Sequence, residues 1–128
     1  MRRTFLDYLA KEGVIAADRV EQIRGLLRSV PEPIGSIAFS YGMIAGGDID
    51  TILDEQQRDY RPFGEIAISM NLLTREQVDT LLGVQRIRAA TECAEALALS
   101  GMCKIDEIMP KLGQFLLAYQ ETILTVEC

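Results

Sequence analysis

The 128-residue chain is 48% hydrophobic, which provides enough apolar material for a core and excludes a disordered chain. Its formal net charge of −6 disfavours a nucleic-acid-binding protein, because such proteins need Lys and Arg to displace the counterions of phosphates. No apolar run approaches the roughly 18 residues that span a bilayer, and the start, Met1 to Phe5, lacks the apolar segment of a signal peptide. We therefore expect one cytoplasmic domain, residues 1–128, without membrane insertion.

One sequence pattern runs through the chain three times. It begins at Phe5, Ile34 and Phe63, in steps of 29 residues (34 − 5 and 63 − 34). The three copies cover about residues 5–27, 34–56 and 63–85. The equivalent turn positions are Gly13, Gly42 and Asn71, which are residue types that tolerate the left-handed conformation. Such a recurrence indicates a repeated supersecondary unit.

Within each copy the pattern predicts two short helices joined by a tight turn. In the third copy, Thr74 and Gln77 have the spacing of a capping box and predict the start of the second helix. The second copy has Gly46-Gly47-Asp48 at this place, which predicts a weaker helix start. Helices of this length do not persist alone in water, so we expect their apolar stripes to pack against each other.

The last third of the chain predicts C-terminal helices over about residues 86–126. One runs from Ala89 to Leu99 and another from Lys104 to Glu121, with Pro110 as either a helix start or a kink. The stretch that begins at Gly101 faintly echoes the earlier turns. We align Ile105 with Ile49, which makes the turn shorter, and we do not count a fourth repeat. No segment alternates with period two, so the sequence predicts an all-α fold of helix-turn-helix units packed as a small helical bundle.

The sequence offers little catalytic equipment. It has no His and no phosphate-binding GxxxxGK[ST] loop, and its three widely spaced cysteines suggest neither a disulfide framework nor a zinc site. An acidic run could attract a divalent cation, although a solvated helix face is the stronger interpretation. The run comprises Asp48, Asp50, Asp54 and Glu55. We therefore expect a chain without enzymatic activity, metal or cofactor, and we expect buried or unreactive thiols at Cys93, Cys103 and Cys128.

Two copies also carry a family resemblance. The second copy places Ile34-Gly35, Ala38, Gly42, Ile49, Leu53 and Gln56 at a spacing that the third repeats with Phe63-Gly64, Ala67, Asn71, Val78, Leu82 and Gln85. This spacing resembles the amino-terminal domain of type II secretion and type IV pilus assembly ATPases (GspE/MshE type). That family has an Arg-Leu-Gly start, periodic leucines, a turn glycine and a closing glutamine. The resemblance covers residues 33–85 best and reaches back to Phe5 more loosely.

The resemblance implies two kinds of binding. In the MshE subgroup the tandem motifs bind cyclic di-GMP, whereas other members dock this domain to an inner-membrane partner. A cyclic di-GMP site would use Ile34, Gly35, Leu53, Gln56, Arg61, Phe63, Gly64, Leu82 and Gln85. The family's motif arginine falls on Pro33 and Pro62, which offer neither charge nor a donor, and Arg61 could replace it in one copy only. The residues alone also allow the two glycines to serve close helix packing and the two glutamines to be ordinary helix formers.

Two functional hypotheses result. The first is a non-enzymatic interaction or regulatory module that docks to a protein partner, such as a secretion or pilus assembly component, or to further copies of itself. The second is a receptor domain for cyclic di-GMP, which would then be the chain's ligand.

Overall fold

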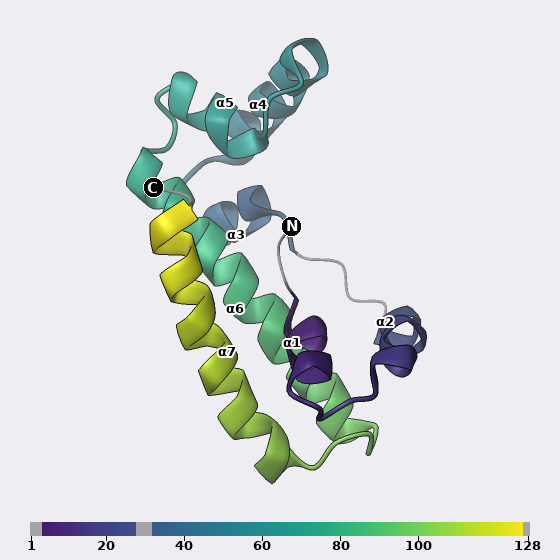
Figure 1. The fold of residues 1–128 in the computed structure, drawn as a ribbon. Helices are drawn as coiled ribbons and strands as arrows, with labels where there is room; N and C mark the ends of the chain where they lie inside the picture. The colour runs from purple at the N-terminus through teal and green to yellow at the C-terminus, as the bar shows by residue number, and fades with distance from the viewer. Residues whose placement is uncertain (1–3, 28–31, 127–128) are drawn as a thin grey trace. The chain divides into compact units, whose positions relative to one another are not determined.

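The computed structural model describes residues 4–27 and 32–126 (Figure 1). These residues form seven α-helices, one 3-10 helix (η1) and no strand, which confirms the all-α prediction. In chain order the elements are α1 (Phe5–Lys11), η1 (Ala17–Arg19), α2 (Val20–Leu27), α3 (Ile34–Ser40), α4 (Gly46–Asp59), α5 (Phe63–Ser69), α6 (Arg75–Leu99) and α7 (Ile105–Val126). Among the helices in this part of the chain, none has both the length and the apolar composition needed to cross a bilayer.

Each of the three predicted copies is a pair of helices joined by the same turn. The first helices begin at Phe5, Ile34 and Phe63, as the sequence predicted. The predicted turn residues have positive φ angles: Gly13 at 78°, Gly42 at 72° and Asn71 at 60°. Glycine and asparagine are the residues that adopt this conformation at least steric cost. The turn chemistry of the repeat was therefore predicted correctly.

Hydrogen bonds fix the geometry of these turns. One residue beyond each turn position, a backbone amide donates to the carbonyl of a fully buried residue in the first helix. The three bonds run from Val14 to Leu9, from Met43 to Ala38 and from Leu72 to Ala67, each with an N–O distance of 2.9 Å. The next residue in each copy, Ile15, Ile44 or Leu73, is buried. The turn thus closes the end of one helix and anchors the chain before the second helix begins.

A fourth copy of the unit corrects the prediction of only three. Gly101 has a φ of 81°, and Cys103, two residues later, is buried and donates its amide to the carbonyl of fully buried Leu97. Seven residues separate Gly101 from buried Ile108, the same number that separates Gly42 from Ile49 (108 − 101 and 49 − 42). The sequence alignment had paired Ile105 with Ile49, which is out of register by three residues. This copy starts at Cys93, at a step of 30 rather than 29 residues (93 − 63).

The four copies pack as two pairs. Contacts divide the chain into unit 1, Met1–Val30 with Ile87–Cys128, and unit 2, Pro31–Arg86. Unit 1 therefore combines the first and fourth copies, and unit 2 combines the second and third. Each unit has its own apolar core. That the two units make up a single domain stays a prediction.

Helix α6 differs from the sequence prediction in its length. The sequence predicted a third copy that ends at about residue 85 and a separate helix from Ala89 to Leu99, but the structure has one helix from Arg75 to Leu99. The segment between the two expected helices contains neither proline nor a capping residue, so nothing in it ends a helix. Pro110 lies inside α7, which begins five residues earlier at Ile105 rather than at the proline.

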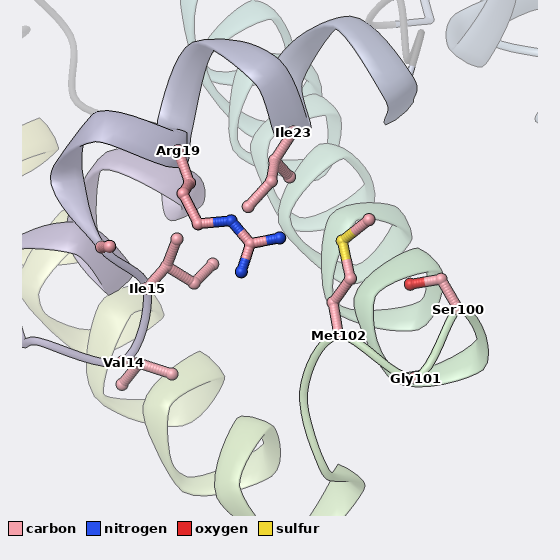
Figure 2. A pocket seen from close by; sticks show the side chains of 8 residues that line it. Val14, Ile15, Arg19, Ile23, Ser100, Gly101 and Met102 are labelled. Atoms are coloured by element: carbon pink, nitrogen blue, oxygen red, sulfur yellow. The ribbon is translucent and has the colours of Figure 1, made fainter.

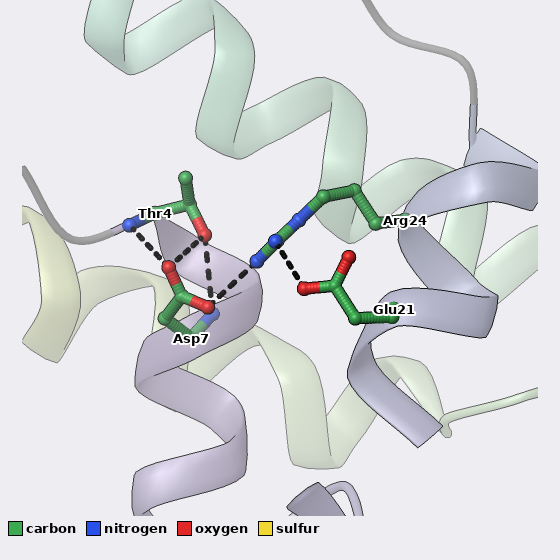
Figure 3. Close-up of polar contacts among 4 residues, drawn as sticks. All are labelled: Thr4, Asp7, Glu21 and Arg24. Atoms are coloured by element: carbon green, nitrogen blue, oxygen red, sulfur yellow. Dashed lines mark hydrogen bonds and ion pairs between the residues drawn. The ribbon is translucent and has the colours of Figure 1, made fainter. Parts of the chain in front are cut away.

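The start of α1 is held by a small polar network (Figure 3). Thr4 and Asp7 form a capping box, and Arg24 of α2 contacts the Asp7 carboxylate at 2.7 Å and Glu21 at 2.7 Å. Partial burial opposes ionisation of Asp7, but the hydrogen bonds from Thr4 and the charge of Arg24 outweigh it and hold the pKa of this carboxyl below its usual value. The network joins the two helices of the first copy.

The fourth copy places Cys93 in the core of unit 1, where burial, with a smaller effect from Cys103, raises the pKa of the Cys93 thiol from 9.0 to about 11. This agrees with the expectation of buried thiols for Cys93 and Cys103; Cys128 lies outside the described residues. At pH 8 such a rise lowers the thiolate fraction about a hundredfold. We expect iodoacetamide to modify Cys93 in the folded chain far more slowly than in urea, as peptide mapping would measure.

The raised pKa of Cys93 also makes the stability of the folded chain depend on pH. The folded chain favours the protonated thiol, so the stabilisation is complete below the unfolded pKa of 9.0 and is lost as the pH rises through about 11. Equal modification rates of Cys93 at pH 8 with and without urea would contradict its place in the core.

Candidate functional site

The nine residues that the sequence assigned to a ligand site all belong to unit 2. Ile34, Gly35 and Gly64 are buried, Gln56, Phe63, Leu82 and Gln85 are half-buried, and Leu53 and Arg61 are exposed. Several of them lie close together in the structure. The contacts that they make, however, are with each other and with the protein backbone.

The two glycines are packing positions. A Cβ atom on Gly35 would lie 2.8 Å from Cζ of Phe63, and one on Gly64 would lie 2.6 Å from Cγ1 of Val78 and 3.5 Å from Cδ1 of Ile34. Neither glycine has a positive φ, so the missing side chain and not backbone freedom is what the structure needs. Each repeat therefore presses an apolar side chain against the glycine of the other. This favours the packing interpretation of both residues.

The closing glutamines make reciprocal contacts between the two repeats. Nε2 of Gln56 donates to the carbonyl oxygen of Arg61 at 3.1 Å, just before the third copy. Nε2 of Gln85 donates to the carbonyl oxygen of Glu32 at 2.8 Å, just before the second copy. In both cases the acceptor residue precedes a proline that caps the next helix, at Pro33 or Pro62. The glutamines thus hold the entry segments of both repeats, a role that the sequence did not suggest.

Arg61, the one cation proposed for the ligand site, already has partners. Its Nε lies 2.6 Å from the Asp59 carboxylate, and its Nη2 donates to Oγ of Ser69 at 3.4 Å. Both members of the ion pair are more than a third exposed, so the pair is weak and an anion could compete for the guanidinium.

The acidic run on α4 does not form a metal site. Within residues 4–27 and 32–126, no group of three or more His, Cys, Asp or Glu side chains is placed to hold an ion. The Asp48 carboxylate instead accepts a hydrogen bond from the Ala45 amide at 3.0 Å, which helps to start α4 despite its glycines.

The fourth copy differs from the others in the side chains that it exposes. Leu99, Met102, Ile105 and Met109 are 84%, 40%, 58% and 63% exposed, and we call them the repeat-4 surface. They flank a single turn, at the end of α6 and the start of α7. Ile105 and Met109 are four residues apart on α7 and so lie on the same side of that helix.

Comparison of the copies shows which of these residues the fold requires. The positions equivalent to Leu99 hold Lys11, Ser40 and Ser69; those equivalent to Ile105 hold Ala17, Gly46 and Arg75; those equivalent to Met109 hold Glu21, Asp50 and Asp79. All nine of these residues are exposed. The same turn therefore forms with small, polar or charged residues at these places. The large apolar side chains of the fourth copy are not needed to fold it.

Sequence reasoning missed this surface because it missed the repeat. A step of 30 residues was the available signal, since it aligns Gly101 with Asn71 and Cys103 with Leu73. Only with this alignment does the sequence show that the fourth copy has large apolar residues where the other copies have small or polar ones.

The role of the closing glutamines is testable. Replacing Gln85 with Met keeps the length of the side chain and removes its donor, leaving the Glu32 carbonyl without this bond. We expect the free energy of unfolding to fall by about 0.5–1 kcal/mol, the lower part of the range for one hydrogen bond, because the bond is exposed. Urea unfolding measures this, and exposed Gln57, whose side chain makes no hydrogen bond within the described part of the chain, provides the Gln57→Met control. Equal effects of the two substitutions would show that the contact does not stabilise unit 2.

No family model, curated protein or solved structure matches this chain. The resemblance to the amino-terminal domain of secretion and pilus ATPases stays a prediction.

Proposed function

We propose that the chain is a non-enzymatic interaction module that docks to a protein partner through the repeat-4 surface. The observation that carries this proposal is the internal comparison: three of the four copies have small or polar residues where the fourth exposes Leu99, Ile105 and Met109. Single exposed apolar residues are ordinary in proteins, but several around one turn are typical of an interaction site.

The free-energy cost of exposing these apolar side chains supports the same function. Exposing a large apolar side chain forgoes about 1.5–3 kcal/mol relative to burying it, and it carries a risk of aggregation. The fold gains nothing from these side chains at these positions, whereas a partner that covers them gains the burial. Met102 and Met109 are flexible and polarisable, which suits a surface that adapts to its partner.

Charge indicates the chemistry of that partner. Asp106 and Glu107 are exposed beside the apolar residues of α7, with Lys104 as the neighbouring cation, and the whole chain carries a net charge of −6. A partner with an apolar face and basic residues at its rim fits this arrangement, because opposite charges at the rim favour association and orientation. A secretion or pilus assembly component is the partner that the family resemblance would imply.

A substitution at Met109 tests the proposal. Met109→Lys places a charge in the apolar surface, and we expect it to weaken partner binding at least tenfold, as for an interface residue that contributes strongly to binding. Asp79→Lys introduces the same side chain at the equivalent exposed position of the third copy and serves as the control. The measurement is capture by the immobilised full chain from native lysate, quantified for both variants and for the unmodified chain.

Site-specific photo-crosslinking identifies the surface directly. A photoreactive side chain at position 109 should give a defined adduct, and the same group at position 79 should not. Adducts composed of two copies of the chain would assign the surface to self-association. Equal capture by Met109→Lys and Asp79→Lys would refute docking through repeat 4.

Cyclic di-GMP binding to unit 2 is the second candidate function. It is favoured by the reciprocal contacts of Gln56 and Gln85, because two equivalent repeats suit a ligand with two equivalent halves. Against it stand the prolines at both motif-arginine positions and the existing contacts of Arg61 and of the glutamine amides. The docking function needs no such rearrangement.

Isothermal titration separates the two candidates. The docking proposal predicts no heat of binding with cyclic di-GMP at concentrations up to about 100 μM, which would reveal any dissociation constant in the micromolar range. GTP and cyclic di-AMP are the controls for nonspecific nucleotide binding. Saturable binding selective for cyclic di-GMP would make unit 2 a receptor, and Arg61→Gln would then be expected to weaken it.

A further inference from the structure

A cavity of about 400 Å³ opens in unit 1 between the turns of the first and fourth copies (Figure 2). Its volume lies within the range of small-molecule sites. Apolar side chains from both turns form its walls, among them Val14, Ile15, Ile23 and Met102. The Ser100 hydroxyl also lines it, but that group donates to the Leu97 carbonyl at 3.2 Å. The cavity therefore has apolar side chains in its walls, although its exposed lining as a whole is somewhat more polar than apolar.

Arg19 is the one ionisable residue that lines this cavity. Figure 2 shows its guanidinium extending between the side chains of Ile15 and Ile23 towards Met102. Within the described part of the chain, Arg19 makes no ion pair or side-chain hydrogen bond. A cation with unused donors, beside a cavity that also has apolar side chains in its walls, is suited to binding an anionic group.

The other copies show that Arg19 departs from the local pattern. Its equivalents include Asp48 and Gln77, whose side chains accept hydrogen bonds from the backbone amides of Ala45 and Thr74 at the start of the second helix. An arginine cannot accept such a bond, and a positive charge near a helix N-terminus is unfavourable. Arg19 is therefore unfavourable for the helix start at which it lies, and such an unfavourable residue is most readily explained by a function.

The fourth turn contributes a further donor. In the first three copies, the amide of the residue directly after the turn position donates to a buried carbonyl of the first helix. In the fourth copy the equivalent carbonyl, that of Leu97, accepts from the amide of Cys103, which lies one residue further along. The amide of Met102, a cavity residue, thereby has no hydrogen-bond partner among the residues that the structure describes. It is open to water or to a ligand.

We propose that this cavity binds a small organic anion with an apolar body. Its carboxylate or phosphate group pairs with the Arg19 guanidinium, and its apolar part packs against Ile15, Ile23 and Met102. The net charge of −6 means that the chain as a whole repels anions. A preference for the anionic form must therefore come from Arg19 itself. Met102 belongs both to this cavity and to the repeat-4 surface, but binding of the anion needs no protein partner.

A matched pair of ligands tests the site in the full chain. Octanoate and 1-octanol have apolar tails of similar size, and only octanoate is anionic at pH 7. In an NMR titration of the ¹⁵N-labelled chain, we expect octanoate to shift the amides of residues 14–19 and 100–102 saturably and to bind about tenfold more tightly than 1-octanol, which corresponds to about 1.4 kcal/mol. Octyl phosphate and inorganic phosphate distinguish a carboxylate from a phosphate headgroup and from a free ion.

Variants assign the charge preference to one residue. Arg19→Gln should remove the preference for octanoate and leave 1-octanol binding unchanged, whereas Arg19→Lys should retain part of it. Lys104→Gln removes an exposed charge two residues from Met102 without altering the cavity lining, and it should keep the preference. The proposal is overturned by equal binding of octanoate and 1-octanol, by shifts centred outside the two turns, or by a preference that survives Arg19→Gln.

Discussion

The turn between the two helices of each copy is the constraint on which the structure depends. A residue with positive φ reverses the chain, a following amide closes onto a fully buried carbonyl, and the residue two places after the turn position enters the core. Because the first helices of copies one to three have only seven residues each, they cannot be stable alone. The turn sets the angle at which the second helix covers the first, and pairing with another copy completes each core.

The sequence predicted the parts of this arrangement that are local. Glycine or asparagine at the turn, apolar residues at helical spacing and the Thr74–Gln77 capping box are all encoded within a few residues, and the structure has each of them. The pairing of copies is not local. Nothing near Phe5 indicates that its ring packs against Phe115, with centroids 5.3 Å apart. The fourth copy was missed because one extra residue shifts its step and because Cys93 replaces the Phe or Ile that opens the other copies.

The predicted ligand residues illustrate how a family pattern can reflect folding alone. Glycines that admit Phe63 and Val78, and glutamines that hold the chain ahead of Pro33 and Pro62, are sufficient reasons for those residues in unit 2. In unit 1, Phe115 stands at the position of Gln85 and packs with Phe5 and Tyr8 instead. Function is better sought where one copy departs from the others without benefit to the fold. Arg19 and the apolar residues of the repeat-4 surface are such departures, and both lie beside the turns of unit 1.

The pairing of the first and fourth copies carries this account, since both proposed sites are defined by comparing them with the second and third. An aromatic NOE experiment on the full chain tests it most directly. The account predicts cross-peaks between the ring protons of Phe5 and Phe115, together with contacts from Tyr8 to Phe115. A helical, folded chain in which the Phe5 ring shows contacts only to residues of the first three copies would contradict it.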